Sequence, residues 1–394
     1  MDKFLRFIIM AGVIALSLGA PVAAHAQSTL PPFCQAGSLP GHDPKYPADQ
    51  TILVCIPPGW NGQLVMYAHG YVPAQAPLTL PAELFLPDGG LGPNVTMVLS
   101  QGFAFATTSY HKNGYAVEQA RKDLNDLLNH FKKLVKPGSL KKVFLIGASE
   151  GGEIAALMIE HFPDKYAGAL AMCGPIGGGQ YQVQYLSDFR AVFDYYFPSV
   201  FPFGVVDVPE YAFLDWDTYA TQTIPFAMAS NPAATAQLYA VTGAALDPVD
   251  PTSVVKTADS ILFYSIWATN DLIATAGGMP YDNRSTVYLD PSLNAGIERV
   301  QSDGRAQAYM RRFYQTTGDL QRPLVTLHNA LDPVVPFQHE VNYSGLAAQA
   351  GNSALFTINP VNPAALYGHC NFTSDEVGAA FGYLVQQAAA QTGP

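Results

Sequence analysis

Short apolar runs alternate with amphipathic segments in two parts of the chain. Residues 141–146 form a β-branched and aromatic run, and residues 150–157 continue with helical character. Within residues 117–134, apolar side chains recur every three or four positions and Pro137-Gly138 follows, which is typical of an amphipathic helix and its end. The strand-like runs are continuously apolar, and this favours strands that are buried on both faces.

Further strands and helices are expected around these two. The expected strands are 51–56, 63–68, 103–108, 166–173, 323–328 and 354–358, and the expected helices are 337–349 and 374–387. Ser374 is the predicted N-cap of the last helix, residues 28–50 are a predicted lead-in loop, and residues 78–94 a loop with some helix. Because strand and helix alternate, the predicted fold class is α/β, a mostly parallel sheet with helices on both faces.

The alternation stops over residues 175–321, which are rich in aromatic residues and interrupted by prolines. Much of this stretch has helical spacing, so we expect a helical, aromatic-rich cap inserted over one end of the sheet. Segments 27–174 and 322–394 would then form a single α/β domain. The alternative is a separate helical domain packed elsewhere. In either case, most of the aromatic residues are expected in the core of the insertion rather than in the wall of a substrate site.

The N-terminus predicts a signal peptide at residues 1–26. A positively charged start is followed by an apolar run at 7–18 and by Ala24-His25-Ala26, which fits a cleavage site. The apolar run is shorter than the about 20 residues of a spanning helix, although an N-terminal anchor is the alternative. No later segment is long and apolar enough to span a bilayer, so we expect a secreted or periplasmic protein without a membrane span.

The formal charge of the chain is −11, and removal of Asp2, Lys3 and Arg6, a net +1, leaves −12. Charged residues make up only 13% of the sequence. An acidic chain with few charges offers no basic stripe for nucleic acid or anionic lipid, which excludes those partners. The composition suits a protein that handles neutral substrates.

The four cysteines of the chain all lie after the predicted cleavage site. An even number in an oxidising compartment favours disulfides, and four cysteines allow three pairings. We favour Cys34–Cys55 and Cys173–Cys370, and the alternative is four free buried thiols. None of them forms a C-x-x-C pair, so no metal site is expected.

A G-x-S-x-G pattern, Gly147–Gly151, lies between the strand at 141–146 and the helix that follows. On such a turn the serine hydroxyl, here Ser149, is lifted clear of the sheet. The flanking residues are glycines because a side chain on either would collide with neighbouring backbone. Alone, the pattern is short enough to arise by chance, so its weight depends on the other motifs.

Four motifs together resemble those of the α/β-hydrolase superfamily: His69-Gly70 after a strand, Gly147–Gly151, Asp332–Pro336, and Gly368-His369. The resemblance covers roughly residues 51–173 and 323 to the C-terminus. In that superfamily the nucleophile, the acid and the histidine follow one another in this order along the chain. The resemblance therefore implies a triad of Ser149, Asp332 and His369.

Each residue of this triad would have a distinct role. Ser149 needs a base in hydrogen-bond reach, and His369 would take its proton and return it to the leaving group. Asp332 would hold the imidazole in the right tautomer. The resemblance further implies an oxyanion hole formed by the backbone N–H groups of Tyr71 and Glu150.

Other polar residues near these motifs are expected to be structural. His69, His328 and His339 are alternative bases, but we expect a loop or helix-face position for each. Glu150 would lie at the rim of the site, and Glu153 would be a helix-start charge favoured by the helix dipole.

The predicted function is a secreted serine carboxylic-ester hydrolase that acts through an acyl-enzyme, without a metal or organic cofactor. The Gly368-His369-Cys370 run resembles tannases and feruloyl esterases, but Ala148 stands where they have a cysteine. The D-P-x-V-P run resembles prolyl oligopeptidase-like catalytic domains. The substrate would be a small-molecule or polymeric ester of a hydrophobic or aromatic acid. The alternatives are a serine peptidase or amidase, an acyltransferase, or a non-catalytic binding protein.

Overall fold

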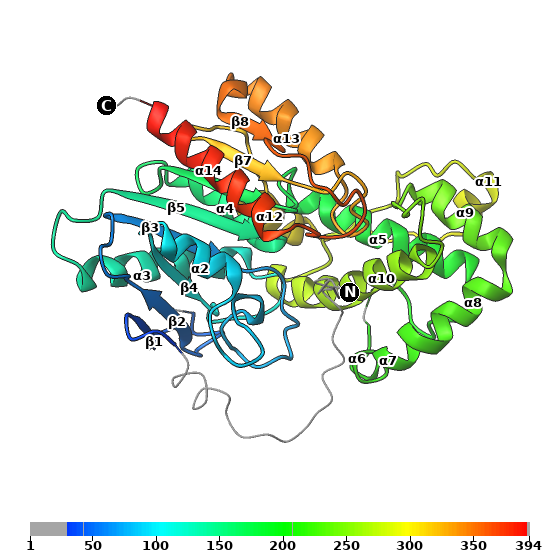
Figure 1. Ribbon diagram of the computed structural model, residues 1–394. Coiled ribbons are helices and arrows are strands. Elements are labelled where there is room, and N and C mark those ends of the chain that lie inside the picture. Colours follow the sequence, from blue (N-terminus) through cyan, green and yellow to red (C-terminus); the bar gives the residue numbers. More distant parts are fainter. Residues whose placement is uncertain (1–29, 42, 207, 392–394) are drawn as a thin grey trace, which may run out of the picture.

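An eight-stranded sheet forms the centre of the protein (Figure 1). The computed structural model describes residues 30–391 apart from 42 and 207, so the predicted signal peptide at 1–26 lies outside the described residues. The order across the sheet is β1-β2-β4-β3-β5-β6-β7-β8. The strands are β1 Cys34–Leu39, β2 Gln50–Cys55, β3 Gln63–Ala68, β4 Ala104–Thr108, β5 Lys142–Ala148, β6 Gly168–Met172, β7 Leu324–Leu327 and β8 Phe356–Ile358.

The sheet is parallel from β4 to β8, and β2 runs antiparallel to both β1 and β4. Successive strand residues point to opposite faces: Leu64 and Met66 lie in one hydrophobic cluster, while Val65 and Tyr67 lie in the other. The strands from β2 to β7 are thus buried on both faces, as their continuously apolar sequences predicted.

Helices cover both faces of the sheet. The helices α3 (Val117–Leu134) and α4 (Glu150–His161) contribute to the first cluster, and α2 (Pro93–Ser100) and α14 (Ser374–Ala390) contribute to the second. The helix α13 (Gln338–Gln349) also belongs to the first cluster, and two short 3-10 turns lie at Ala82–Leu84 and Ser353–Leu355. The predicted α/β fold class, a mostly parallel sheet with helices on both faces, is confirmed.

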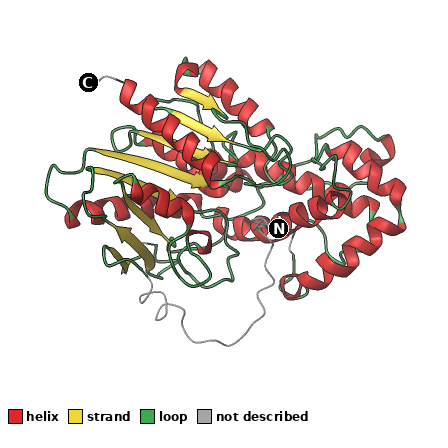
Figure 2. Cartoon of the chain, viewed as in Figure 1, coloured by secondary structure: helices red, strands yellow, loops and turns green. Residues whose placement is uncertain are grey.

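Between β6 and β7 the chain forms helices but no strand among the described residues (Figure 2). They are α5 Gly179–Tyr196, α6 Tyr211–Leu214, α7 Trp216–Thr218, the π-helical turn Tyr219–Thr223, α8 Ile224–Ser230, α9 Pro232–Thr242, α10 Ser253–Ala276, α11 Pro291–Gly296 and α12 Gly304–Phe313. Most of them lie beyond the carboxyl ends of the parallel strands (Figure 1). Their buried side chains join the same hydrophobic cluster as those of α3 and α4.

Two local features differ from the prediction, while the loop with some helix expected at 78–94 contains a 3-10 turn and the start of α2. The predicted loop at 28–50 contains β1, an edge strand whose middle residues are exposed, so no apolar run marks it. The N-cap of α14 is Thr373 rather than Ser374, because Thr373 and Glu376 cap each other's backbone N–H groups.

Two disulfides pair the cysteines as favoured from the sequence. Cys34 and Cys55 lie directly opposite each other on β1 and β2. The other disulfide joins Cys173, just after β6, to Cys370 in the loop that precedes α14.

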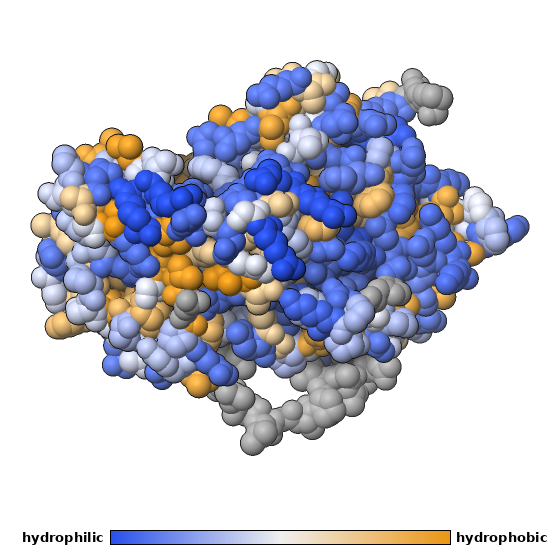
Figure 3. Space-filling model, turned by 180° about the vertical axis from the view of Figure 1, so that it is seen from behind, coloured by the Kyte–Doolittle hydropathy of each residue, from blue (hydrophilic) through white to orange (hydrophobic). Residues whose placement is uncertain are grey.

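The surface in Figure 3 is largely hydrophilic, and hydrophobic side chains gather on the side occupied by the insertion. The exposed large apolar side chains of that segment include Leu214, Phe226, Val287 and Leu289. Within the part of the chain that the structure describes, no helix combines the length and the apolarity needed to cross a membrane.

Candidate active site

The backbone turns sharply at Ser149, between β5 and α4. Ser149 has φ 55° and ψ −124°, a conformation that residues other than glycine rarely adopt. A Cβ on Gly147 would overlap the carbonyl oxygen of Gly151, and a Cβ on Gly151 would overlap that of Ala68 at the end of β3. Both glycines are therefore required by contacts with backbone, and the hydroxyl of Ser149 stands at the end of the sheet.

In the predicted triad, His369 lies within hydrogen-bond distance of both Ser149 and Asp332. His369 Nε2 is 2.8 Å from Ser149 Oγ, and His369 Nδ1 is 2.7 Å from Asp332 Oδ2. A carboxylate accepts only, so Nδ1 carries the proton and the lone pair of Nε2 faces the serine hydroxyl. In this tautomer His369 can take a proton from Ser149.

Asp332 is fully buried and is held by backbone groups of its own loop. Its Oδ1 accepts from the N–H groups of Val334 at 2.8 Å and Val335 at 3.0 Å. Burial alone would raise the pKa of this carboxyl, but attraction to His369 and hydrogen bonds from His328 and His369 lower it to about 2. Asp332 is therefore ionised throughout the physiological pH range.

The loop that carries His369 is constrained on both sides of the histidine. Gly368 has φ 119°, a conformation that favours glycine, and Cys370 has φ 52°. Cys370 is joined to Cys173, which itself has φ 45°. The histidine loop is thus anchored to the end of β6, the strand beside the serine-bearing β5.

The loops after β5, β7 and β8 thus bring a serine, an acid and a histidine together at one end of the sheet. A strand–turn–helix serine with this chain order of partners defines one architecture. The chain has the α/β-hydrolase fold. Within this fold, the insertion 175–321 follows β6 and precedes the acid loop.

Sequence comparison gives one partial match. No protein-family model matches the chain. Over 137 residues it is 31% identical to an o-phthalyl amidase of Xanthobacter agilis, a match that covers 33% of this chain and 28% of the amidase. The chain therefore matches well under two thirds of that relative's length.

Three solved structures with similar folds have low sequence identity. Feruloyl esterase B from Aspergillus oryzae has a TM-score of 0.47 and 14% identity, covering 86% of this chain and 74% of its own. An esterase of Pyrococcus furiosus has a TM-score of 0.46 and 11% identity, and the match covers 93% of this chain and 96% of the esterase. Acylaminoacyl peptidase of Pyrococcus horikoshii has a TM-score of 0.43 and 8% identity, and the match covers 90% of this chain and 41% of the peptidase.

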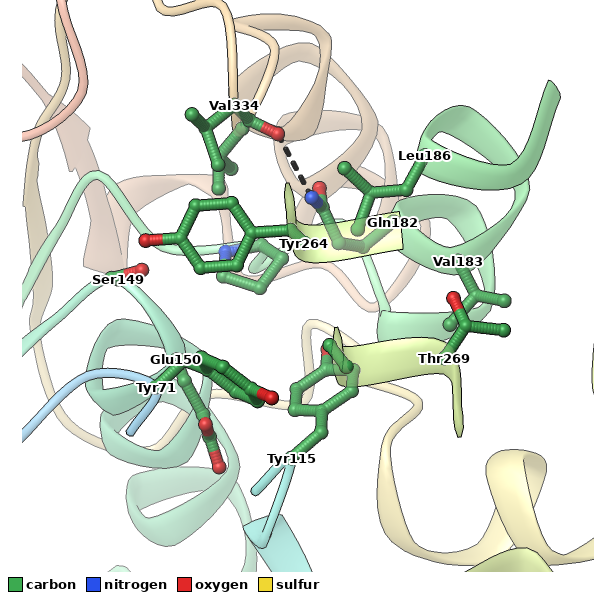
Figure 4. Close-up of a pocket in the computed structure, with 13 residues that line it drawn as sticks. Tyr71, Tyr115, Ser149, Glu150, Gln182, Val183, Leu186, Tyr264, Thr269 and Val334 are labelled. Atoms are coloured by element: carbon green, nitrogen blue, oxygen red, sulfur yellow. Dashed lines mark hydrogen bonds between the residues drawn. The ribbon is translucent and has the colours of Figure 1, made fainter. Parts of the chain in front are cut away.

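A cavity opens beside Ser149 (Figure 4). Its lining from the α/β part is Tyr71, Tyr115, Ser149, Glu150, Val334 and Val335. Its lining from the insertion is Pro175, Gln182, Val183, Leu186, Tyr264, Ala268 and Thr269. The Gln182 side-chain amide donates to the Val334 carbonyl at 2.9 Å, which ties α5 to the acid loop. A largely apolar and aromatic lining suits a hydrophobic group.

Tyr264, on α10, is the insertion's aromatic residue in the cavity wall. Its ring lies edge-on to those of His369 and Tyr71, with centroid distances of 6.5 and 5.7 Å. By contrast, Phe189 and Phe193 on α5 are fully buried.

The two residues predicted for the oxyanion hole lie beside Ser149. Glu150 is the first residue of α4, so its N–H has no partner within the helix. Tyr71 follows Gly70, where an added Cβ would lie 3.1 Å from Ser149 Cβ. Both residues line the cavity, but the donor role of their N–H groups stays a prediction.

Glu150 lines the cavity and Glu153 lies in the first turn of α4, and both residues are buried. Glu150 accepts from the Ala116 N–H at 2.7 Å, and Glu153 accepts from the Tyr115 hydroxyl. Burial raises the pKa of Glu150 to about 8, although the Ala116 bond and Lys112 act in the opposite direction. Both residues lie where we expected them, beside the site and at the start of a helix, but we did not expect their burial.

The alternative histidines are also buried. His69 stacks on Tyr110 and contacts the Gly70 carbonyl. His339 on α13 contacts Gln182 at 2.9 Å. His328 Nε2 lies 3.6 Å from Asp332 Oδ2, a contact that we did not expect. The position of His328, only four residues before Asp332 in the sequence, could have indicated this contact.

Among the described residues, one group of potential metal ligands comes together, namely Cys173, His369 and Cys370. The two sulfurs are bonded to each other, so neither is available as a thiolate ligand.

Proposed function

We propose that the protein is a serine hydrolase that cleaves esters of hydrophobic or aromatic carboxylic acids through an acyl-enzyme. The observation that carries this proposal is the Ser149–His369–Asp332 arrangement, with 2.8 and 2.7 Å between successive partners, beside an apolar cavity.

The reaction would proceed in two halves. His369 Nε2 takes the proton of Ser149 while Oγ attacks the substrate carbonyl, and Asp332 stabilises the resulting imidazolium. The N–H groups of Tyr71 and Glu150 would stabilise the oxyanion. His369 then donates its proton to the leaving alcohol, and a water activated by the same histidine releases the acid.

The second candidate is an amide hydrolase. The partial match to an o-phthalyl amidase favours it. The same residues could cleave an amide, provided that His369 protonates the leaving amine. An acyltransferase would use the same acyl-enzyme with an alcohol or amine in place of water.

We further infer that the protein acts outside the cytoplasm and that residues 175–321 form a cap over the active site. The sequence at 1–26 and the two disulfides support export, since disulfides persist in oxidising compartments. The insertion residues in the cavity wall support the cap.

A substrate panel tests the proposal. The mature protein is assayed with p-nitrophenyl acetate, butyrate and benzoate and with matching p-nitroanilides, beside Ser149→Ala. We expect ester hydrolysis that falls at least about 10³-fold in the variant, since the nucleophile is then absent.

Equal ester hydrolysis by the wild type and Ser149→Ala would contradict the proposal. Anilide hydrolysis that exceeds ester hydrolysis would instead identify the amidase.

A further inference from the structure

A second buried histidine lies against the carboxylate that holds His369. His328 Nε2 is 3.6 Å from Asp332 Oδ2, the same oxygen that accepts from His369 Nδ1. The side chains of His328 and Asp332 are both 0% exposed. One carboxylate oxygen therefore faces two imidazoles, of which His369 contacts Ser149.

Both ring nitrogens of His328 face oxygen acceptors. Nδ1 is 2.9 Å from Glu340 Oε1 on α13, and Nε2 is 2.8 Å from the Val335 carbonyl oxygen. A neutral imidazole would turn one lone pair toward an oxygen, whereas an imidazolium donates at both positions. The other oxygen of Glu340 accepts from the Thr326 hydroxyl at 2.7 Å, so the whole group is satisfied when Glu340 is a carboxylate.

The neighbouring groups leave His328 as the site of positive charge. His339, also on α13, accepts from the Gly177 N–H at 3.1 Å and contacts the Gln182 amide oxygen, the pattern of a neutral ring. Burial lowers the pKa of His339 well below its usual value. From α5, Tyr185 donates its hydroxyl to the Pro333 carbonyl, and burial raises its pKa well above the usual value.

The charges around His328 favour the imidazolium. Burial alone would lower its pKa, but hydrogen bonds and attraction from Asp332 and Glu340 raise it to about 10.

We propose that His328 is a positioning residue of the triad: as a buried imidazolium paired with Glu340, it orients Asp332 and competes with His369 for the same carboxylate oxygen. This inference rests on the proposed function. The positive charge would offset part of the negative charge that His369 experiences from Asp332. The acid limb of the activity profile should then lie at lower pH than it would with Asp332 serving His369 alone.

The pH dependence of kcat/KM tests this role. His328→Gln and Glu340→Gln are assayed on a p-nitrophenyl ester between about pH 4 and pH 9, at a constant ionic strength of about 0.1 M so that the screening of charges does not vary. The first variant removes a positive charge beside Asp332, so we expect the acid limb to move to higher pH by about one unit. The second removes a negative charge while Asp332 still faces His328, so the acid limb should move in the opposite direction, to lower pH.

His111→Gln is the matched control. His111 is a buried histidine whose Nδ1 lies 2.8 Å from Asp123. Asp123 belongs to α3, so this pair lies outside the triad loops. Its loss should lower stability without moving the acid limb. If His328→Gln does not fold, as judged by near-ultraviolet circular dichroism, Glu340→Gln carries the kinetic test.

The ¹⁵N spectrum of histidine-labelled protein gives a readout that does not depend on activity. At about pH 8, well above the ordinary histidine pKa of about 6.5, we expect the signals of one imidazole ring with both nitrogens protonated. These signals should be absent from the spectrum of His328→Gln and shifted in the spectrum of Glu340→Gln. This signal would persist even if Ser149→Ala showed that the proposed hydrolase function is wrong. A neutral His328 at that pH, or an unmoved acid limb in the folded variants, would overturn the inference.

Discussion

Ser149 is held in a strained backbone conformation by its surroundings on both sides. Its N–H donates to the Met172 carbonyl of β6, and its own carbonyl accepts from the Gly152 N–H in α4. Such conformations persist where neighbouring structure over-determines them. This part of the site could be predicted from the sequence, because the strand, the turn glycines and the helix are all local.

The burial of Glu150 could not be predicted in the same way. Its partner is the N–H of Ala116, 34 positions earlier in the chain, and no short-range pattern connects the two. The position of His328 depends similarly on Glu340, which reaches it from the next helix. Long-range contacts thus decide which polar residues near a motif are buried.

The buried carboxyl of Glu150 should make stability depend on pH. Because its pKa is raised from 4.5 to about 8, the folded state keeps a proton that the unfolded chain has lost between these values. The contribution of Glu150 to the free energy of unfolding therefore falls as pH rises from 4.5 to 8, by about 1.4 kcal/mol per pH unit and by roughly 3 kcal/mol at pH 7. In Glu150→Gln the free energy of unfolding should match the wild type near pH 4 and exceed it increasingly toward pH 8.

Urea unfolding at several pH values checks this expectation. The activity of Glu150→Gln should stay within about threefold of the wild type, because the N–H that would serve the oxyanion is unchanged. A stability difference that does not vary with pH would contradict the assignment of Glu150 as a protonated buried group.

Elements whose hydrophobic pattern is strong could be predicted closely. The helix expected at 117–134 has those bounds in the structure, and the parallel strands lie within one or two residues of their predicted positions. The strand β1 could not be predicted, because it is held by backbone pairing with β2 at the edge of the sheet rather than by burial of apolar side chains.

The disulfide after β6 should act on catalysis through the histidine loop. Cys370 is bonded to His369 through the chain and to Cys173 through sulfur. Replacing both cysteines by serine should lower kcat/KM on an ester by about 10- to 100-fold, since small displacements of a catalytic group have effects of this size.

Steady-state kinetics on the folded variant, beside a matched one, provide the measurement. Replacement of Cys34 and Cys55, which join β1 to β2, should lower stability while leaving kcat/KM close to the wild type. If both double variants lost activity equally, the Cys173–Cys370 disulfide would have no special part in placing His369.

At the scale of the whole molecule, the site arises where the carboxyl ends of the parallel strands meet the insertion. The alternation of strands and helices predicted the sheet, and the order of the motifs predicted which loops converge. The shape of the cavity could not be predicted, because it depends on how α5 and α10 pack against the loops after β5 and β7. Of the insertion's many aromatic residues, Tyr264 lines the cavity, while rings such as Phe189 lie in the core.

In the proposed function, Ser149 is a nucleophile that His369 activates. Incubation with a fluorophosphonate, which phosphonylates activated serines, followed by mass spectrometry of the digested protein, tests it most directly. We predict one adduct per chain, on the peptide that contains Ser149, and no adduct in Ser149→Ala or His369→Ala. An adduct on another residue, or an unlabelled wild-type protein that still hydrolyses esters, would contradict the account.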